Sequence, residues 1–139
     1  PNNLFPYIGQ IISGKKKFLK VYGNKYNTKD GTGARDYVHI EDLCDSHIKS
    51  IDILKKKKIK DIFNIGSGKP TTVLSVIKTF KKYCNLNIKF KYYKNRPGDF
   101  GSIFTSNIKA KKKLNWKPKK KLKDIILSTY NYYKNERYN

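Results

Sequence analysis

Two of the three arginines in this sequence are its best candidates for binding an anion. Arg35 lies in the segment Gly-Ala-Arg-Asp-Tyr and Arg96 in Arg-Pro-Gly-Asp-Phe, and both segments read as glycine-bearing loops. Lysine is the dominant cation of the chain, so a retained arginine indicates a need for the planar guanidinium, which holds two phosphate or carboxylate oxygens at once. We therefore expect an anion site at these loops. The alternative is an ordinary ion pair with Asp36 or Asp99.

Two glycine-containing motifs suggest nucleotide binding at first sight, and neither fits. Gly-Ser-Gly-Lys at residues 66–69 lacks the first glycine of the P-loop spacing, and Pro70 stands where a P-loop has the serine or threonine that holds magnesium. Gly-Thr-Gly at residues 31–33 is not enclosed by a strand and a helix, as a dinucleotide fingerprint must be. We expect plain turns at both places.

Histidine and cysteine chemistry is sparse. His39 and His47 have no serine or cysteine partner at a recognisable spacing, so we expect both to be hydrogen-bonded structural residues. Cys44 and Cys84 form no CxxC pair and sit in apolar periodic segments, which predicts free, buried thiols and a reducing compartment such as the cytoplasm. The sequence predicts neither a metal site nor a membrane span.

The composition is strongly basic, with 32 Lys+Arg against 10 Asp+Glu and a formal net charge of +22. Such a balance is typical of nucleic-acid-binding proteins. However, the lysines are spread over runs at residues 15–17, 55–58, 111–113 and 117–121. The residue usage also resembles what AT-rich codons give, so we interpret these runs as solvated surface and expect no nucleic-acid partner.

The hydrophobic pattern alternates between strand and helix and predicts an α/β fold. Helices are expected at about residues 4–12, 40–54, 73–83 and 122–133, and strands at 18–22, 36–40, 62–65 and 88–93. Thr71 or Thr72 is the expected cap of the third helix. The long polar loop at residues 23–35 is either functional or disordered. The sequence has no methionine, so we expect that Pro1 is not the native start.

Four segments together resemble one enzyme family. They are Asn-Asn-Leu-Phe-Pro-Tyr (2–7), Val-Tyr-Gly-Asn (21–24), Asp-Gly-Thr-Gly-Ala-Arg-Asp-Tyr-Val-His (30–39) and Arg-Pro-Gly-Asp (96–99). In this order and at these separations they resemble the UDP-glucose 4-epimerases, which are extended short-chain dehydrogenases/reductases. Trp116 matches the region before that family's last helix. The resemblance covers essentially the whole chain, and the Asp-Gly-Thr-Gly segment is its most specific part.

The resemblance implies a diphosphate site made from both halves of the chain. Asn3 and Leu4 match the pair that contacts the diphosphate at a helix start, where N–H groups are free for an anion. Arg35 and Arg96 match the two arginines that clamp it, in agreement with the argument from composition.

The same resemblance implies contacts to the rest of a UDP-sugar. Lys20 and Tyr22 match the strand that holds uracil, Tyr37 lines the pocket, and Asp99 matches the carboxylate that binds the ribose. Ile103 stands where the family carries a tyrosine or a small residue, a choice that resembles a filter on N-acetylated sugars. No catalytic residue is expected in this chain.

The resemblance further implies that residues 1–139 are the C-terminal, substrate-binding part of such an enzyme, with elements that complete a Rossmann-type parallel sheet. The NAD-binding domain, with its glycine-rich turn and its Tyr-x-x-x-Lys pair, is expected upstream of Pro1. The intact enzyme is expected to bind NAD, to form a homodimer, and to interconvert UDP-glucose and UDP-galactose at C4 in galactose metabolism. The chain alone is expected to be inactive.

Two alternatives stay open. Other extended reductases of nucleotide sugars, such as dehydratases, decarboxylases and C5-epimerases, share the arginine and ribose-carboxylate pattern but usually lack the long Asp-Gly-Thr-Gly loop. A basic nucleic-acid-binding module is the second alternative, and its binding would weaken steeply with added salt.

Overall fold

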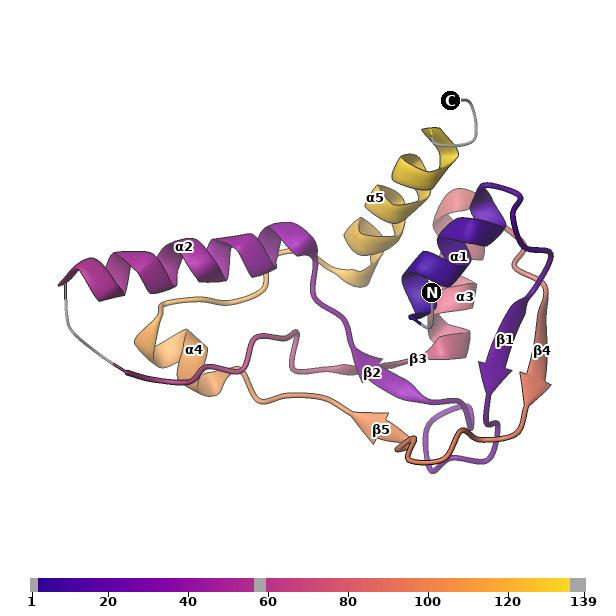
Figure 1. The fold of residues 1–139 in the computed structure, drawn as a ribbon, viewed down its shortest axis with the longest axis horizontal. Helices are drawn as coiled ribbons and strands as arrows, with labels where there is room; N and C mark the ends of the chain where they lie inside the picture. The colour runs from indigo at the N-terminus through magenta and orange to yellow at the C-terminus, as the bar shows by residue number, and fades with distance from the viewer. Residues whose placement is uncertain (1–2, 57–59, 136–139) are drawn as a thin grey trace.

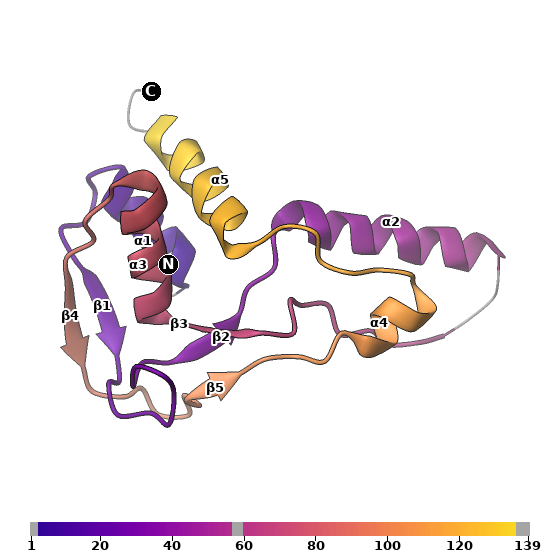
Figure 2. The same cartoon turned by 180° about the vertical axis from the view of Figure 1, so that it is seen from behind.

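The computed structural model describes residues 3–56 and 60–135, which form an elongated α/β molecule with a thick end and a thin end (Figure 1). The thick end contains α1 (Leu4–Ile12), α3 (Val73–Cys84), α5 (Leu122–Asn135), β1 (Leu19–Tyr22) and β4 (Phe90–Tyr93). The thin end contains α2 (Ile40–Lys56) and α4 (Ile108–Lys113). Extended segments that include β2 (Ala34–Asp36), β3 (Pro70–Thr72) and β5 (Ser102–Ile103) run between the two ends, as the view from behind also shows (Figure 2).

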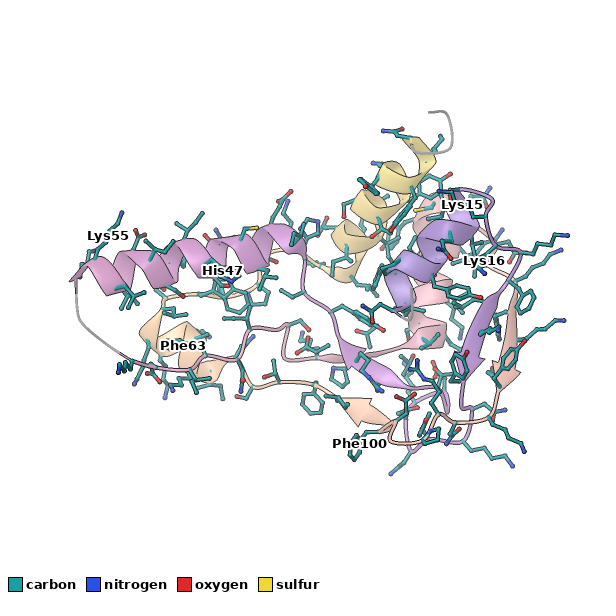
Figure 3. All side chains as sticks on the ribbon, in the orientation of Figure 1. Lys15, Lys16, His47, Lys55, Phe63 and Phe100 are labelled. Atoms are coloured by element: carbon teal, nitrogen blue, oxygen red, sulfur yellow. The ribbon has the colours of Figure 1, made fainter. Side chains whose placement is uncertain are left out.

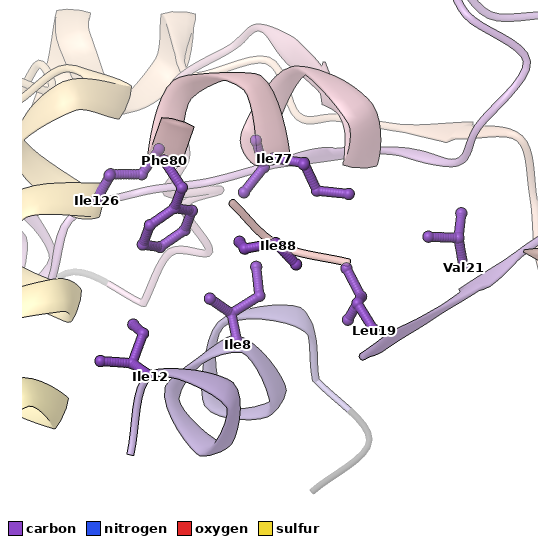
Figure 4. Close-up of a cluster of buried hydrophobic side chains, with 9 residues drawn as sticks. Ile8, Ile12, Leu19, Val21, Ile77, Phe80, Ile88 and Ile126 are labelled. Atoms are coloured by element: carbon purple, nitrogen blue, oxygen red, sulfur yellow. The ribbon is translucent and has the colours of Figure 1, made fainter. Parts of the chain in front are cut away.

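The main hydrophobic core lies in the thick end, where three helices meet the β1–β4 pair (Figure 4). The four expected helices are all present. Apolar residues at helical spacing on α1, α3 and α5 pack into this core. Thr72 caps α3, since its side chain accepts a hydrogen bond from Ser75 N. The fully buried members include Ile8, Leu19, Val76, Phe80 and Ile126.

The strands form two small sheets. β1 and β4 pair in parallel, from Leu19 opposite Phe90 to Tyr22 opposite Tyr93. In the second sheet the order is β3-β2-β5, with β2 antiparallel to β3 and parallel to β5. The strand expected at residues 36–40 is wrong in position, because the backbone partners that β3 and β5 offer are opposite residues 34–36.

The strand expected at residues 62–65 is also wrong: no strand pairs with this segment in the described part of the chain. The segment still alternates, with Ile62 83% exposed while Phe63 and Ile65 pack against a second buried cluster. That cluster consists of Ala110, Leu114 and Trp116. The short apolar run thus predicted an extended segment, but a strand also needs a neighbouring strand for backbone pairing.

α2 leaves most of its apolar stripe in solvent. Ile48, Ile51 and Leu54 are 59%, 51% and 55% exposed, and Cys44 is exposed as well. The expectation that Cys44 is buried is therefore wrong. The helix instead buries Asp42, whose carboxylate accepts hydrogen bonds from Lys119 N and Lys120 N.

The described lysines of these runs lie on the outside of the molecule. Lys15 and Lys16 follow α1, whereas Lys55 lies at the far end of α2, as the side-chain view shows (Figure 3). Phe100 is labelled in the same view and is also exposed, on the loop before β5. The described basic residues are thus distributed over both ends of the molecule, as expected for solvated surface.

Candidate UDP-sugar pocket

One pocket of about 550 Å³ lies where the start of α1, strand β1 and the loops around β2 and residues 96–99 converge. Most of the residues that the sequence predicted for substrate binding line it, although they come from four separate segments. These are Asn3, Leu4, Lys20, Tyr22, Arg35, Tyr37, Arg96 and Asp99. Their roles toward a ligand stay predictions, but the fold brings them to one place.

The first turn of α1 forms one wall and has the properties of an anion site. Asn3 occupies the N-cap position, yet its side chain makes no capping hydrogen bond. The first turn contains no acidic residue. The N–H groups of a first helical turn have no partner within the helix and carry a partial positive charge, so those of Leu4 and Phe5 suit a phosphate.

Another part of the lining consists of the two arginines, which are joined through one carboxylate. Arg96 Nε donates to Asp99 Oδ2 at 2.8 Å, and Arg35 Nη2 lies 3.8 Å from Asp99 Oδ1. The ion pair that sequence analysis kept as the alternative is therefore present, with Asp99 and not with Asp36. One carboxylate against two guanidinium groups leaves this trio with a net charge of +1, so an anionic ligand is still favoured there.

The backbone also fixes the direction of Arg35. Its Nη1 donates to Ala34 O at 2.8 Å and to Phe100 O at 2.9 Å. The Arg96 guanidinium instead lies over the Tyr22 ring, 4.8 Å from the ring centre. Each arginine thus has part of its hydrogen-bonding fork held by protein, and both side chains line the pocket.

The long loop before β2 is ordered by its own polar groups. Tyr26 N donates to Gly31 O at 3.0 Å, and Thr28 Oγ1 donates to Thr32 O at 2.7 Å. Gly31 has φ +77°. A methyl group on this glycine would lie 2.3 Å from Asn24 O, so the turn requires glycine.

Asp30 ties this loop to the cap of α3. Its carboxylate accepts hydrogen bonds from Thr32 Oγ1 at 2.6 Å and from Thr72 Oγ1 at 2.5 Å. Burial raises the pKa of Asp30, but the hydrogen bonds from Thr32 and Thr72 together lower it by more. The pKa of Asp30 therefore lies below its usual value. The charged form of Asp30 therefore holds the loop that leads into Arg35.

Tyr37 is a half-buried residue in the lining of the pocket. Its ring meets Phe5 edge-on, with ring centres 5.1 Å apart. Burial raises the pKa of Tyr37 to about 12, although the nearby Arg35 opposes the shift. The hydroxyl therefore stays protonated at neutral pH and is suited to hydrogen bonding and packing, not to accepting a proton.

Ile103 lies outside the lining of this pocket. It is 49% exposed and stands opposite Arg35 in the β2–β5 pair. Sequence reasoning missed several lining residues, among them Tyr7, Tyr26 and Val73. For Tyr26, the signal available in the sequence was the pair of glycines at positions 23 and 33, because glycines leave room for an aromatic ring to pack against the backbone.

The glycine motif at residues 66–69 has backbone N–H groups that are already occupied by a carboxylate. Ser67 N and Gly68 N, which a phosphate would need, donate to the Asp36 carboxylate at 2.7 and 3.1 Å. Asp36 also accepts from Thr105 N at 3.2 Å, so its function is to join three segments. The described residues therefore do not fit the pyrophosphate of NAD.

The described part of the chain also offers no evident catalytic or metal centre. A Tyr-x-x-x-Lys spacing occurs at Tyr130 and Lys134, but Tyr130 packs against the core on α5 and does not line the pocket. His39 is buried and hydrogen-bonded to Ser128, as predicted for a structural histidine. No cluster of three His, Cys, Asp or Glu side chains among these residues could hold a metal ion.

The family model described as GDP-mannose 4,6 dehydratase matches residues 1–129. The chain belongs to this family of extended short-chain dehydrogenases/reductases. Among curated relatives, it is 37% identical to the UDP-glucose 4-epimerase of Bacillus subtilis and 39% identical to UDP-glucose 4-epimerase 2 of Arabidopsis thaliana. These alignments cover 95% and 99% of the chain but only 39% and 40% of the two relatives.

Solved structures agree with the fold. The Stenotrophomonas maltophila UDP-glucose-4-epimerase with bound NAD and formylated UDP-arabinopyranose matches with a TM-score of 0.95 at 31% identity, over 98% of this chain and 40% of that one. The Bifidobacterium longum UDP-glucose 4-epimerase in complex with NAD+ and UDP matches with a TM-score of 0.87 at 36% identity, over 99% and 41%. The α/β fold class and the match to the C-terminal part of epimerase structures are confirmed.

The chain thus spans about two fifths of the length of the curated relatives it matches. The family is one of NAD-dependent nucleotide-sugar enzymes, as the ligands named for the solved structures indicate. Within residues 3–56 and 60–135, each helix is too short or too polar to span a bilayer.

Proposed function

We propose that this chain is the UDP-sugar-binding part of a UDP-glucose 4-epimerase. The intact enzyme interconverts UDP-glucose and UDP-galactose by NAD-dependent oxidation and reduction at C4 of the hexose. In this proposal residues 1–139 supply nucleotide anchoring, whereas the NAD site and the catalytic pair belong to a part of the enzyme outside them. Homodimerisation, a cytoplasmic location and a role in galactose metabolism complete the proposal.

The observation that carries the proposal is the pocket itself. The first turn of α1 and the Arg35–Asp99–Arg96 cluster line one pocket of about 550 Å³, enough for a nucleoside diphosphate. The α1 terminus and the net charge of the cluster both favour the diphosphate. β1 borders the pocket and has β4 as its single strand partner in the described chain, so its other edge has no strand against it and is the edge that we assign to the base.

Within the pocket, we assign the predicted residues to parts of the ligand. Leu4, Arg35 and Arg96 bind the diphosphate, and Asn3 supports them at the helix start. Lys20 and Tyr22 hold the uracil along β1. Asp99 accepts hydrogen bonds from the ribose while it orients both arginines, and Tyr37 lines the pocket.

Titration calorimetry with UDP and ADP tests the anchoring role. We expect saturable binding of UDP at moderate salt and much weaker binding of ADP, because strand edges discriminate bases by hydrogen-bond pattern. Equal binding of the two nucleotides, or loss of all binding at moderate salt, would contradict the proposal. The second outcome would favour the polyanion-binding alternative, whose affinity falls steeply with salt.

A second reaction within the family has one specific observation in its favour. The Bacillus cereus UDP-glucuronic acid 4-epimerase in complex with UDP-glucuronic acid and NAD matches with a TM-score of 0.81 at 26% identity. Turnover assays of the intact enzyme with UDP-galactose and UDP-galacturonic acid separate the two. We expect turnover of the neutral sugar, and exclusive turnover of the uronic acid would refute the 4-epimerase assignment for UDP-hexoses.

A further inference from the structure

Tyr26 occupies an unusual position among the pocket residues, because its side chain lies against three glycines, two from its own loop and one from the segment before β5. A methyl group on Gly23 would lie 2.3 Å from Tyr26 Cε2, and one on Gly101 would lie 3.0 Å from Tyr26 Cβ. A methyl group on Gly33 would lie 4.0 Å from Tyr26 Cε2. The ring thus fills the space that these three backbones leave free, and larger residues at positions 23 and 101 would displace it.

The segments that meet at this ring carry Arg35 and Arg96, the two arginines that we call the diphosphate clamp. Gly33 is two residues before Arg35, and its methyl position lies 3.7 Å from Arg35 Nη1. Asn95, next to Arg96, places its Oδ1 2.5 Å from the Gly23 methyl position, beside the ring. Gly101 is adjacent to Phe100, whose carbonyl oxygen accepts from Arg35 Nη1.

The hydroxyl of Tyr26, unlike its ring, does not connect these segments. It is buried and has no hydrogen-bond partner among the described residues. An unpaired buried hydroxyl does not stabilise a protein, so the packing of the ring explains this residue better than its polar group.

From this geometry we infer that Tyr26 is a positioning residue for the diphosphate clamp: its ring holds the segments of Arg35 and Arg96 at the separation that a diphosphate needs. The inference rests on the proposed function and adds a residue to it. A guanidinium binds two oxygens only when its plane is correctly placed, so a shift of either segment loses bonds to phosphate but not to the uracil.

The test compares UDP with uridine in the purified protein that carries this chain, by calorimetry for UDP and by competition for uridine. The ratio of the two dissociation constants reports on the diphosphate contacts alone, which a general loss of stability does not change. In Tyr26→Leu we expect the advantage of UDP over uridine to fall roughly tenfold or more, the size of one lost charge-assisted hydrogen bond. In Tyr26→Phe we expect it to stay within about twofold of wild type, because the ring remains.

A second variant keeps the inference testable if Tyr26→Leu does not fold. Gly101→Ala adds a methyl group against the base of the ring at a residue outside the positive-φ region, so the ring must move by a few tenths of an ångström. It should lower the same ratio by a few-fold. Tyr83→Leu, on the exposed side of α3 and outside the pocket, is the matched control and should leave the ratio unchanged.

Two outcomes would overturn the inference, and a third would refute the proposed function on which it rests. An unchanged ratio in Tyr26→Leu, or in Gly101→Ala where the first variant does not fold, would show that the ring does not position the clamp. An equal loss in Tyr26→Phe would assign the effect to the hydroxyl. A wild-type protein that binds neither UDP nor uridine would refute the proposed function. Where the wild-type protein does bind UDP, a changed ratio in a variant cannot be explained by failure of the proposed function.

Discussion

Replacing each clamp arginine by lysine tests whether the pocket binds diphosphate by geometry or by charge alone. Arg35→Lys and Arg96→Lys both keep the net charge of the protein. Lysine presents a single ammonium group and cannot copy the planar fork. In wild type, Arg35 holds Ala34 O and Phe100 O through Nη1 while Nη2 faces Asp99, and one ammonium cannot serve all of these and a phosphate.

The expected magnitudes differ between the two positions. One charge-assisted hydrogen bond contributes about 1.5–3 kcal/mol, which corresponds to roughly a ten- to hundredfold change in affinity. The Arg35 side chain is 31% exposed and that of Arg96 is 45% exposed. Solvent weakens the more exposed contact. We therefore expect Arg96→Lys to lose affinity near the lower limit of this range and Arg35→Lys to lose more.

Calorimetric titration of UDP-glucose at one fixed ionic strength measures both effects. The control is the double variant Lys111→Ala, Lys112→Ala, which removes two charges from exposed positions of α4, outside the pocket. We expect this variant to bind as wild type does. If it loses as much affinity as the arginine variants, binding is diffuse electrostatics and the assignment of a clamp to Arg35 and Arg96 is wrong.

Four further predictions concern stability and activity. Trp116→Ala should lower the free energy of unfolding by about 3–5 kcal/mol in urea titration, because the indole is fully buried and also donates a hydrogen bond to a backbone oxygen at 2.8 Å. The control Phe104→Ala, at a position 57% exposed, should change this free energy by less than about 0.5 kcal/mol. Gly31→Ala should lower the free energy of unfolding by more than the roughly 1–2 kcal/mol of left-handed strain and should weaken UDP binding. Gly14→Ala, with φ +78° and nothing within 4 Å of the added methyl group, should show the strain alone, and equal losses of stability in the two variants would argue against the clash with Asn24 O. The lowered pKa of Asp30 stabilises the fold above the unfolded-state value of about 3.9, so unfolding titrations should show stability falling as pH drops below about 4, and Asp30→Asn should reduce that dependence; an unchanged pH profile would contradict this account. The purified 139-residue chain should show no conversion of UDP-galactose to UDP-glucose, and measurable turnover in a coupled assay would show that catalytic residues have been overlooked.

The helices and the two arginines were accessible to sequence reasoning because they depend on local information. Helical spacing of apolar residues predicted α1, α2, α3 and α5, and Thr72 was one of two expected caps. The unusual retention of Arg35 and Arg96 among so many lysines pointed to an anion site before any family was considered. Family resemblance then supplied the other expected site residues.

The sequence by itself therefore determined the α/β class, the helices and the types of residue in the pocket, because each follows from periodicity or from side-chain chemistry. Strand pairing was decided only by the tertiary structure, since a ladder requires a partner at the right place: residues 62–65 alternate like a strand but pair with none in the described chain. The sharing of Asp99 by both arginines and the enclosure of Tyr26 by three glycines were also decided there. Both depend on segments some 70 positions apart in the sequence that come together only when β2 and β5 pair.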